Sequence, residues 1–102
     1  MAEVLTIEDL RRRIDVIDDQ LVRLLNVRVA CAVEVGRLKH GSGVPVYQPD
    51  REKQVLEQVR QSATTLSGPL NGEAIVRIFE RVIDEARRVE REAANRRDEA
   101  QP

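Results

Sequence analysis

The feature that most constrains the fold is a proline-free stretch between Thr6 and His40 in which apolar residues recur at steps of three and four. This spacing places one apolar face along an α-helix and predicts a long helix over residues 6–40. Thr6 and Asp9 have the pattern of a capping box at its start, and Gly41-Ser42-Gly43 provide a terminator. The apolar positions are Leu10, Ile14, Ile17, Leu21, Leu24, Cys31, Val35 and Leu38.

A helix of this length is about 50 Å long at 1.5 Å per residue. The 102 residues fit a single domain, residues 1–102, and a compact chain of this size has a radius of gyration of roughly 13 Å. The remaining chain is too short to cover such a rod. We therefore expect a second copy to bury the apolar face in an intertwined homodimer with coiled-coil-like pairing. The alternative is a solvated helix with a frayed end.

The rest of the chain predicts two more helices. Asp50 is a plausible N-cap for a short helix over residues 50–62, and residues 62–71, with Gly68-Pro69, are expected to form a loop. Asn71 caps a third helix of medium length over residues 72–95. The charged residues 96–102 are expected to fray. The predicted fold class is therefore all-α, with three helices.

Composition narrows the possible functions. A net charge of -1 gives no field that would attract nucleic acid or an anionic membrane. A single cysteine, Cys31, excludes an intramolecular disulfide and is expected to be a small core thiol. With His40 as the only histidine, the chain has too few ligands for a zinc cluster. We expect no metal and no cofactor. Neither a leader pattern in Met1 to Leu5 nor a membrane-length apolar run is present, so a cytoplasmic protein is expected.

Two cations lie where the long helix should be apolar. Arg28 occupies the position between Leu24 and Cys31, and Lys39 falls within roughly 20° of the same face. A buried cation requires an anionic partner, so the two side chains could hold a small anion. A buried Arg28–Glu pair with a neighbouring helix is an equally good interpretation. Arg11 lies about 25 Å from Arg28 along the axis, and only an antiparallel partner chain could bring it to the same ligand; otherwise it is a solvated surface charge.

Further charged candidates lie on the other two helices. Arg51 and Glu52 begin the second helix, where a glutamate also favours the helix dipole. Glu90 follows Ala86 by one turn, and its alternative role is a rim charge beside Arg87 or Arg91. The sequence has no Ser-His-Asp set and no phosphate-binding glycine loop. What remains is a set of cations and hydrogen-bond donors that could bind and polarise a substrate.

The same residues carry a family resemblance that runs from about Glu8 to Glu90. The segments are Leu10-Arg11-x-x-Ile14-x-x-Ile17-Asp18, Leu24-Leu25-x-x-Arg28, Ala32-Val33-Glu34-Val35-Gly36-x-x-Lys39, Pro45-Val46-Tyr47-Gln48-Pro49-Asp50-Arg51-Glu52, and Ile78-Phe79-Glu80-x-Val82-Ile83 with Glu90. Together they resemble the all-helical (type II, intertwined-dimer) chorismate mutases. The resemblance implies an isomerase that converts chorismate to prephenate, without a cofactor, in the branch of the shikimate pathway that leads to phenylalanine and tyrosine.

The resemblance also implies roles for individual residues. Arg28 and Arg11 of the partner subunit would bind the two substrate carboxylates. Lys39 would donate to the ether oxygen and a carboxylate, and Glu90 would give the ether oxygen a second hydrogen bond. Glu52 would hold the ring hydroxyl, with Arg51 supporting this network.

Two positions depart from the commoner family pattern. Gln48 stands where many relatives have Asp, which would alter either hydroxyl recognition or loop capping. Ala86 stands where many have Ser, so a carboxylate contact would be lost. These departures would lower activity or indicate dependence on an activating pathway enzyme. The alternative functions are an isochorismate–pyruvate lyase on the same scaffold and a non-catalytic helical dimer that binds a ligand or a partner.

Overall fold

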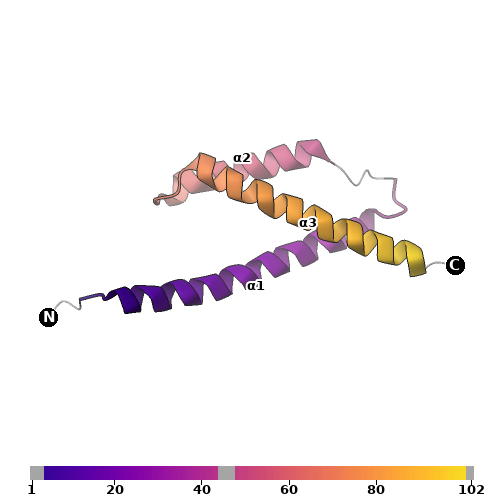
Figure 1. Cartoon of the computed structure of the whole chain (residues 1–102). Coiled ribbons are helices and arrows are strands. Elements are labelled where there is room, and N and C mark those ends of the chain that lie inside the picture. The colour runs from indigo at the N-terminus through magenta and orange to yellow at the C-terminus, as the bar shows by residue number, and fades with distance from the viewer. Residues whose placement is uncertain (1–3, 44–47, 101–102) are drawn as a thin grey trace.

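The computed structural model describes residues 4–43 and 48–100, and every regular element within these ranges is a helix (Figure 1). Helix α1 spans Ile7–Lys39, α2 spans Pro49–Leu66 and α3 spans Gly72–Ala100. The all-α prediction of one long helix followed by two others is confirmed. No described helix is long and apolar enough to cross a membrane.

Helix α1 begins and ends as its sequence predicts. The Asp9 amide donates to Thr6 Oγ1 (3.1 Å), and the Thr6 amide donates in return to Asp9 Oδ2 (3.0 Å), so the capping box is present. His40 is the C-cap. Gly41 and Gly43 follow it with φ of +77° and +81°, the left-handed conformation that glycine adopts at least cost.

Helix α2 differs from its prediction at both ends. It begins at Pro49 with Gln48 as the N-cap, not Asp50, because proline suits the first helical turn, where an amide donor has no intrahelical partner. It continues to Leu66 instead of ending at residue 62. The hydroxyl of Thr64 donates to the carbonyl oxygen of Arg60 (3.4 Å), so this polar side chain has a hydrogen-bond partner within the helix. The loop is accordingly shorter than predicted and covers residues 67–71.

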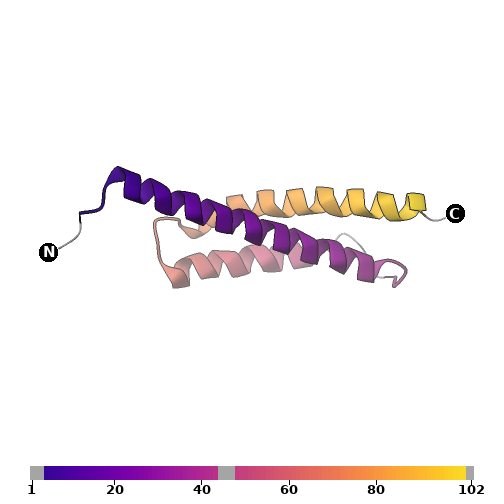
Figure 2. The ribbon, with the colours of Figure 1, turned by 90° about the horizontal axis from the view of Figure 1, so that it is seen from below.

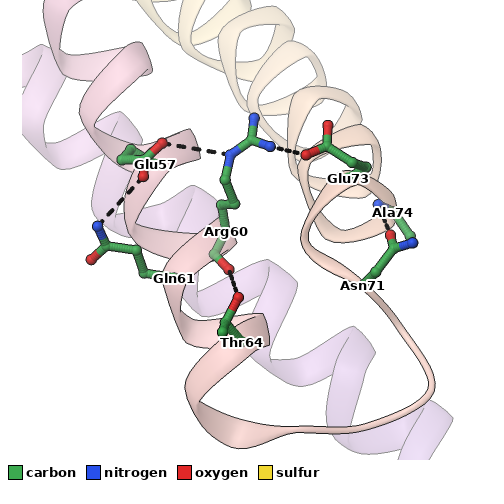
Figure 3. Close-up of polar contacts among 7 residues, drawn as sticks. All are labelled: Glu57, Arg60, Gln61, Thr64, Asn71, Glu73 and Ala74. Carbon is green, nitrogen blue, oxygen red and sulfur yellow. Dashed lines mark hydrogen bonds and ion pairs between the residues drawn. The ribbon is translucent and has the colours of Figure 1, made fainter.

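Helix α3 has the predicted start and a later end. The Ala74 amide donates to Asn71 Oδ1 (2.8 Å), which confirms the Asn71 cap (Figure 3). The helix then continues to Ala100, so the expectation of a frayed tail from residue 96 is wrong up to that residue; 101–102 lie outside the described residues. Ion pairs at helical spacing stabilise the turns before this charged end, with Arg88 bonded to Glu85 (3.1 Å) and Glu92 (2.7 Å).

Helices α2 and α3 form an antiparallel pair, and α1 packs against α3 near the C-terminal end of α1 (Figures 1 and 2). Arg60 joins the pair near its turn, since its guanidinium contacts Glu57 (3.5 Å) and forms an ion pair with Glu73 (Figure 3). Gly72 allows this close approach, because a Cβ there would lie 2.8 Å from Arg60 Cγ. Over the described residues α1 and α2 do not pack against each other.

The single chain is extended and buries little apolar surface. Its radius of gyration is 18.3 Å, against about 13 Å for a compact chain of this length. Val76 and Ala86 are the only fully buried apolar residues in the described part of the chain. The apolar face of α1 is open, with Leu21 51% and Leu24 65% exposed. Cys31 is also exposed, so its predicted core position is wrong for the single chain.

Candidate active site

One face of each of the three helices lines a cavity of about 580 Å³. Each helix contributes residues at three- and four-residue spacing, which is the spacing of a single helical face. Helix α1 contributes Arg28, Cys31, Ala32, Val35, Gly36 and Lys39; the start of α2 contributes Gln48, Arg51, Glu52 and Val55; and α3 contributes Ile83, Ala86, Arg87, Glu90 and Arg91.

The cavity collects every predicted site residue except Arg11. Arg28 and Lys39 share one face of α1, as predicted from their spacing. Arg11 is exposed on the N-terminal part of α1, away from the cavity of its own chain. The structure therefore brings together the candidates from all three helices and leaves out the one that sequence analysis assigned to a partner subunit.

Gln48 and Lys39 link the two ends of the connection between α1 and α2. Lys39 Nζ donates to Gln48 Oε1 over 2.7 Å, and both residues are half-buried. Gln48 is the N-cap residue of α2, yet its side chain makes no capping bond. In this structure the Gln48 amide therefore faces the cavity and bonds to the lysine, and it does not cap α2.

Arg28 is half-buried and its guanidinium lies over the ring of Phe79, with Cζ 5.9 Å from the ring centroid. This distance is within the range of a cation–π contact. Arg28 takes no part in the ion pairs formed among the described residues, so the alternative of an Arg28–Glu pair is wrong for the single chain. The guanidinium is held by an aromatic face and keeps its hydrogen-bond donors for an anion.

Arg87 and Arg91 are cavity residues that sequence analysis considered only as partners of a rim glutamate. Arg87 forms an ion pair with Glu52, which connects α3 to the first turn of α2. Arg51, one residue earlier, donates from Nη1 to Gln54 Oε1 (2.7 Å). The sequence signal for both arginines is that Ile83, Arg87 and Arg91 follow one another at intervals of four residues. This spacing places the two arginines on the same helical face as the apolar Ile83.

Glu90 lies among these cations in a half-buried position. Desolvation raises the pKa of its carboxyl above the ordinary value, and the positive charges of Lys39, Arg87 and Arg28 oppose this rise in that order. The net direction is upward. The protonated form of Glu90, which can donate a hydrogen bond, therefore persists to higher pH than in an ordinary glutamate.

The cavity combines a cationic lining with apolar walls, which suits a small anionic ligand that has a hydrocarbon skeleton. The cations are Arg28, Lys39, Arg51, Arg87 and Arg91, and the apolar residues include Val35, Val55 and Ile83. Among the residues that the structure describes, none of those lining the cavity is a histidine, serine or threonine. Nowhere among the described residues do three His, Cys, Asp or Glu side chains gather closely enough to hold a metal ion. Such a lining can orient a ligand and stabilise developing negative charge.

Comparisons with known proteins agree with this arrangement. Bifunctional chorismate mutase/prephenate dehydratases are 42% identical over 81 residues in Neisseria gonorrhoeae and 33% identical over 78 residues in Aquifex aeolicus. These alignments cover 79% and 76% of this chain but 21% and 22% of the relatives, so the chain spans about a fifth of their length. A crystal structure of chorismate mutase from Helicobacter pylori in complex with prephenate superposes with a TM-score of 0.74 at 28% identity, covering 87% of this chain and 93% of that one.

The family assignment covers the three helical faces that form the cavity. Residues 10–91 match the family described as chorismate mutase type II. This range extends from the first turn of α1 to the last cavity residue of α3. The chain therefore belongs to the chorismate mutase type II family, as its sequence motifs predict.

Proposed function

We propose that this protein is a chorismate mutase that converts chorismate to prephenate in the biosynthesis of aromatic amino acids. The observation that carries the proposal is the convergence of Arg28, Lys39, Glu52 and Glu90, from three helices, on one cavity with apolar walls. Chorismate is a dianion with a hydrocarbon ring, so it matches both the charge and the walls. The related Helicobacter pylori enzyme was crystallised with prephenate, the product of this reaction.

The rearrangement is intramolecular and needs no acid, base or covalent intermediate. The ether carbon–oxygen bond breaks while a carbon–carbon bond forms between the enolpyruvyl group and the ring, and electron pairs move through one cyclic transition state. The cavity would accelerate it by holding the compact conformer of a flexible substrate. Donors aimed at the ether oxygen would stabilise the negative charge that develops there.

We assign Lys39 and Glu90 to the ether oxygen. Lys39 already faces the cavity, with Nζ held by Gln48 at 2.7 Å. Glu90 can donate only when it is protonated, and its raised pKa favours that form. Arg28 would bind one carboxylate with the guanidinium donors that its contact with Phe79 leaves available. Glu52 would accept a hydrogen bond from the ring hydroxyl, and the neighbouring Arg51 would support it.

We further propose that the working unit is a homodimer in the cytoplasm. The open apolar face of α1 supports this, since Ile14, Ile17 and Leu21 are each about half exposed in the single chain. A second copy that covers this face would also bring Arg11 of the partner subunit toward the cavity, as the family resemblance implies. Arg11 would then bind the second carboxylate, while Ala86 offers no hydroxyl for this purpose.

The test is the loss of chorismate absorbance with the purified protein, with the product identified as prephenate. Isochorismate is assayed in parallel, because release of pyruvate from it would identify the lyase instead. Robust turnover of chorismate alone supports the proposal. A folded dimer that converts neither substrate would contradict self-sufficient catalysis. A second assay with an added pathway enzyme then separates dependence on an activating partner from a non-catalytic binding role.

A further inference from the structure

Arg87 is a cavity residue to which the proposed function assigns no task. It lies on α3, one turn before Arg91 and three residues before Glu90, and it crosses to α2 by an ion pair with Glu52. The Arg87 and Glu52 side chains are 36% and 27% exposed, so solvent screens this pair only in part. Asp84, another carboxylate in contact with Arg87, is farther away at 3.6 Å and 60% exposed.

A glutamate at the start of a helix and beside an open cavity has several rotamers. An ion pair with an arginine on the neighbouring helix removes much of this freedom, since the guanidinium is planar and its donors have fixed directions. The pair also joins two of the three helices whose faces line the cavity. One carboxylate oxygen can face Arg87 while the other faces the cavity.

We propose that Arg87 is a positioning residue that fixes the Glu52 carboxylate on the cavity wall for recognition of the substrate's ring hydroxyl. The inference rests on the proposed function and extends it. Arg87 acts through Glu52, so its loss should weaken substrate binding much more than it slows the chemical step at the ether oxygen. The alternative is that Arg87 binds a substrate carboxylate directly, in which case its effect would not depend on Glu52.

Arg87 has a second, independent effect through charge. Glu90 faces Lys39 and Arg28 from α1, shares the cavity with Arg51 and Glu52 from α2, and has Arg87 and Arg91 beside it on α3. Removing the Arg87 cation removes one group that lowers the pKa of Glu90. If activity requires protonated Glu90, the alkaline limb of the pH profile moves to higher pH. This shift reports the charge of Arg87, whereas the effect on KM and its dependence on Glu52 report positioning.

The experiment compares Arg87→Met with a matched control, Arg88→Met, in the full-length protein. Arg88 is the next residue and also pairs with two glutamates, Glu85 and Glu92, but it is exposed and does not line the cavity. Steady-state kcat and KM for chorismate and the pH profile are measured. We expect Arg87→Met to raise KM about tenfold, the lower end of what a charge-assisted hydrogen bond contributes, with a smaller change in kcat. Arg88→Met should match the wild type.

The Glu52→Gln background separates positioning from direct binding. If Arg87 acts through Glu52, Arg87→Met should change KM less than about twofold in that background. A full tenfold effect there would overturn the inference, as would an unchanged KM and pH profile in the single variant. Arg87→Lys keeps the positive charge and should retain the wild-type alkaline limb of the pH profile. It replaces Arg87→Met in the comparison if Arg87→Met does not fold. The wild-type protein is assayed in parallel to separate failure of the proposed function from failure of the Arg87 inference. Absence of turnover in the wild type refutes the proposed function, whereas an active wild type makes the variants a test of Arg87 alone.

Discussion

Replacing Lys39 with alanine is the most direct test of the proposed chemistry. Lys39 Nζ is held 2.7 Å from Gln48 Oε1 at the cavity wall, so the ammonium group is positioned before a substrate arrives. Loss of one preorganised donor to a developing oxyanion typically costs about 100- to 1,000-fold in rate, or about 2.7–4 kcal/mol of transition-state stabilisation. We expect a loss of kcat of this size for Lys39→Ala.

The effect on stability should be small by comparison. The substitution leaves the half-buried Gln48 amide without its protein partner, but water can reach the open cavity and replace it. A cost of about 1 kcal/mol or less is expected in urea denaturation. Lys53→Ala is the matched control, because Lys53 is the other lysine of the chain and lies exposed on α2 outside the cavity. Lys39→Gln keeps a hydrogen-bond donor without the charge, and its kcat should lie between those of Lys39→Ala and Lys53→Ala.

The assay is the decrease of chorismate absorbance at saturating and at limiting substrate, with circular dichroism to verify folding. Equal losses in kcat and kcat/KM would place the Lys39 interaction in the transition state. A rise in KM with unchanged kcat would make Lys39 a binding residue only. A folded Lys39→Ala protein within about threefold of wild-type turnover would refute the assignment of Lys39 to the ether oxygen.

Three further predictions concern pH, assembly and folding. The raised pKa of Glu90 places its ionisation at higher pH than usual, so turnover should fall as pH rises through that pKa. Glu90→Gln should flatten the alkaline limb of the pH profile. An unchanged profile in this variant would refute the role of Glu90. Leu21→Asp should dissociate the proposed dimer in analytical ultracentrifugation and abolish turnover, since a charge replaces a half-exposed apolar side chain on α1; a dimeric, active variant would contradict the interface. Asn71→Ala removes the cap of α3 and should cost about 1 kcal/mol in urea denaturation, whereas an unchanged midpoint would show that water replaces the cap.

The sequence predicts those features of the fold that depend on strong local signals. Thr6 with Asp9 and Asn71 with Ala74 both form the predicted caps, because short polar side chains satisfy amides that the helix itself leaves unpaired. The ends of α2 and α3 were less predictable. Serine and threonine near the end of α2 have weak helix preferences. The charged residues near the end of α3 continue a helix whose preceding turns carry ion pairs such as Arg88–Glu92, and an expectation based on composition overlooks this.

The candidate site was predictable where a charge interrupts an apolar face. Arg28 stands out because the spacing of α1 requires an apolar residue there, and the structure places it on the cavity wall beside Phe79. Arg87 stands out less, because it begins a stretch rich in charged residues in the middle of α3, where one more charge is ordinary. Its place in the cavity depends on the packing of α2 against α3, which no local pattern specifies.

The cavity exists because α1 and α2 both pack against α3, while over the described residues the backbones of α1 and α2 do not approach each other closely. The gap between them is lined by cations whose burial without an anion would be costly. Helix packing leaves these cations facing an open space, where five cationic side chains outnumber the carboxylates of Glu52 and Glu90 and favour binding of an anion. The same α1 face continues toward the N-terminus as exposed apolar residues that an unliganded single chain leaves uncovered. The proposed dimerisation would therefore do two things together: bury that apolar face and bring a further carboxylate-binding cation, Arg11 of the partner subunit, to the cavity.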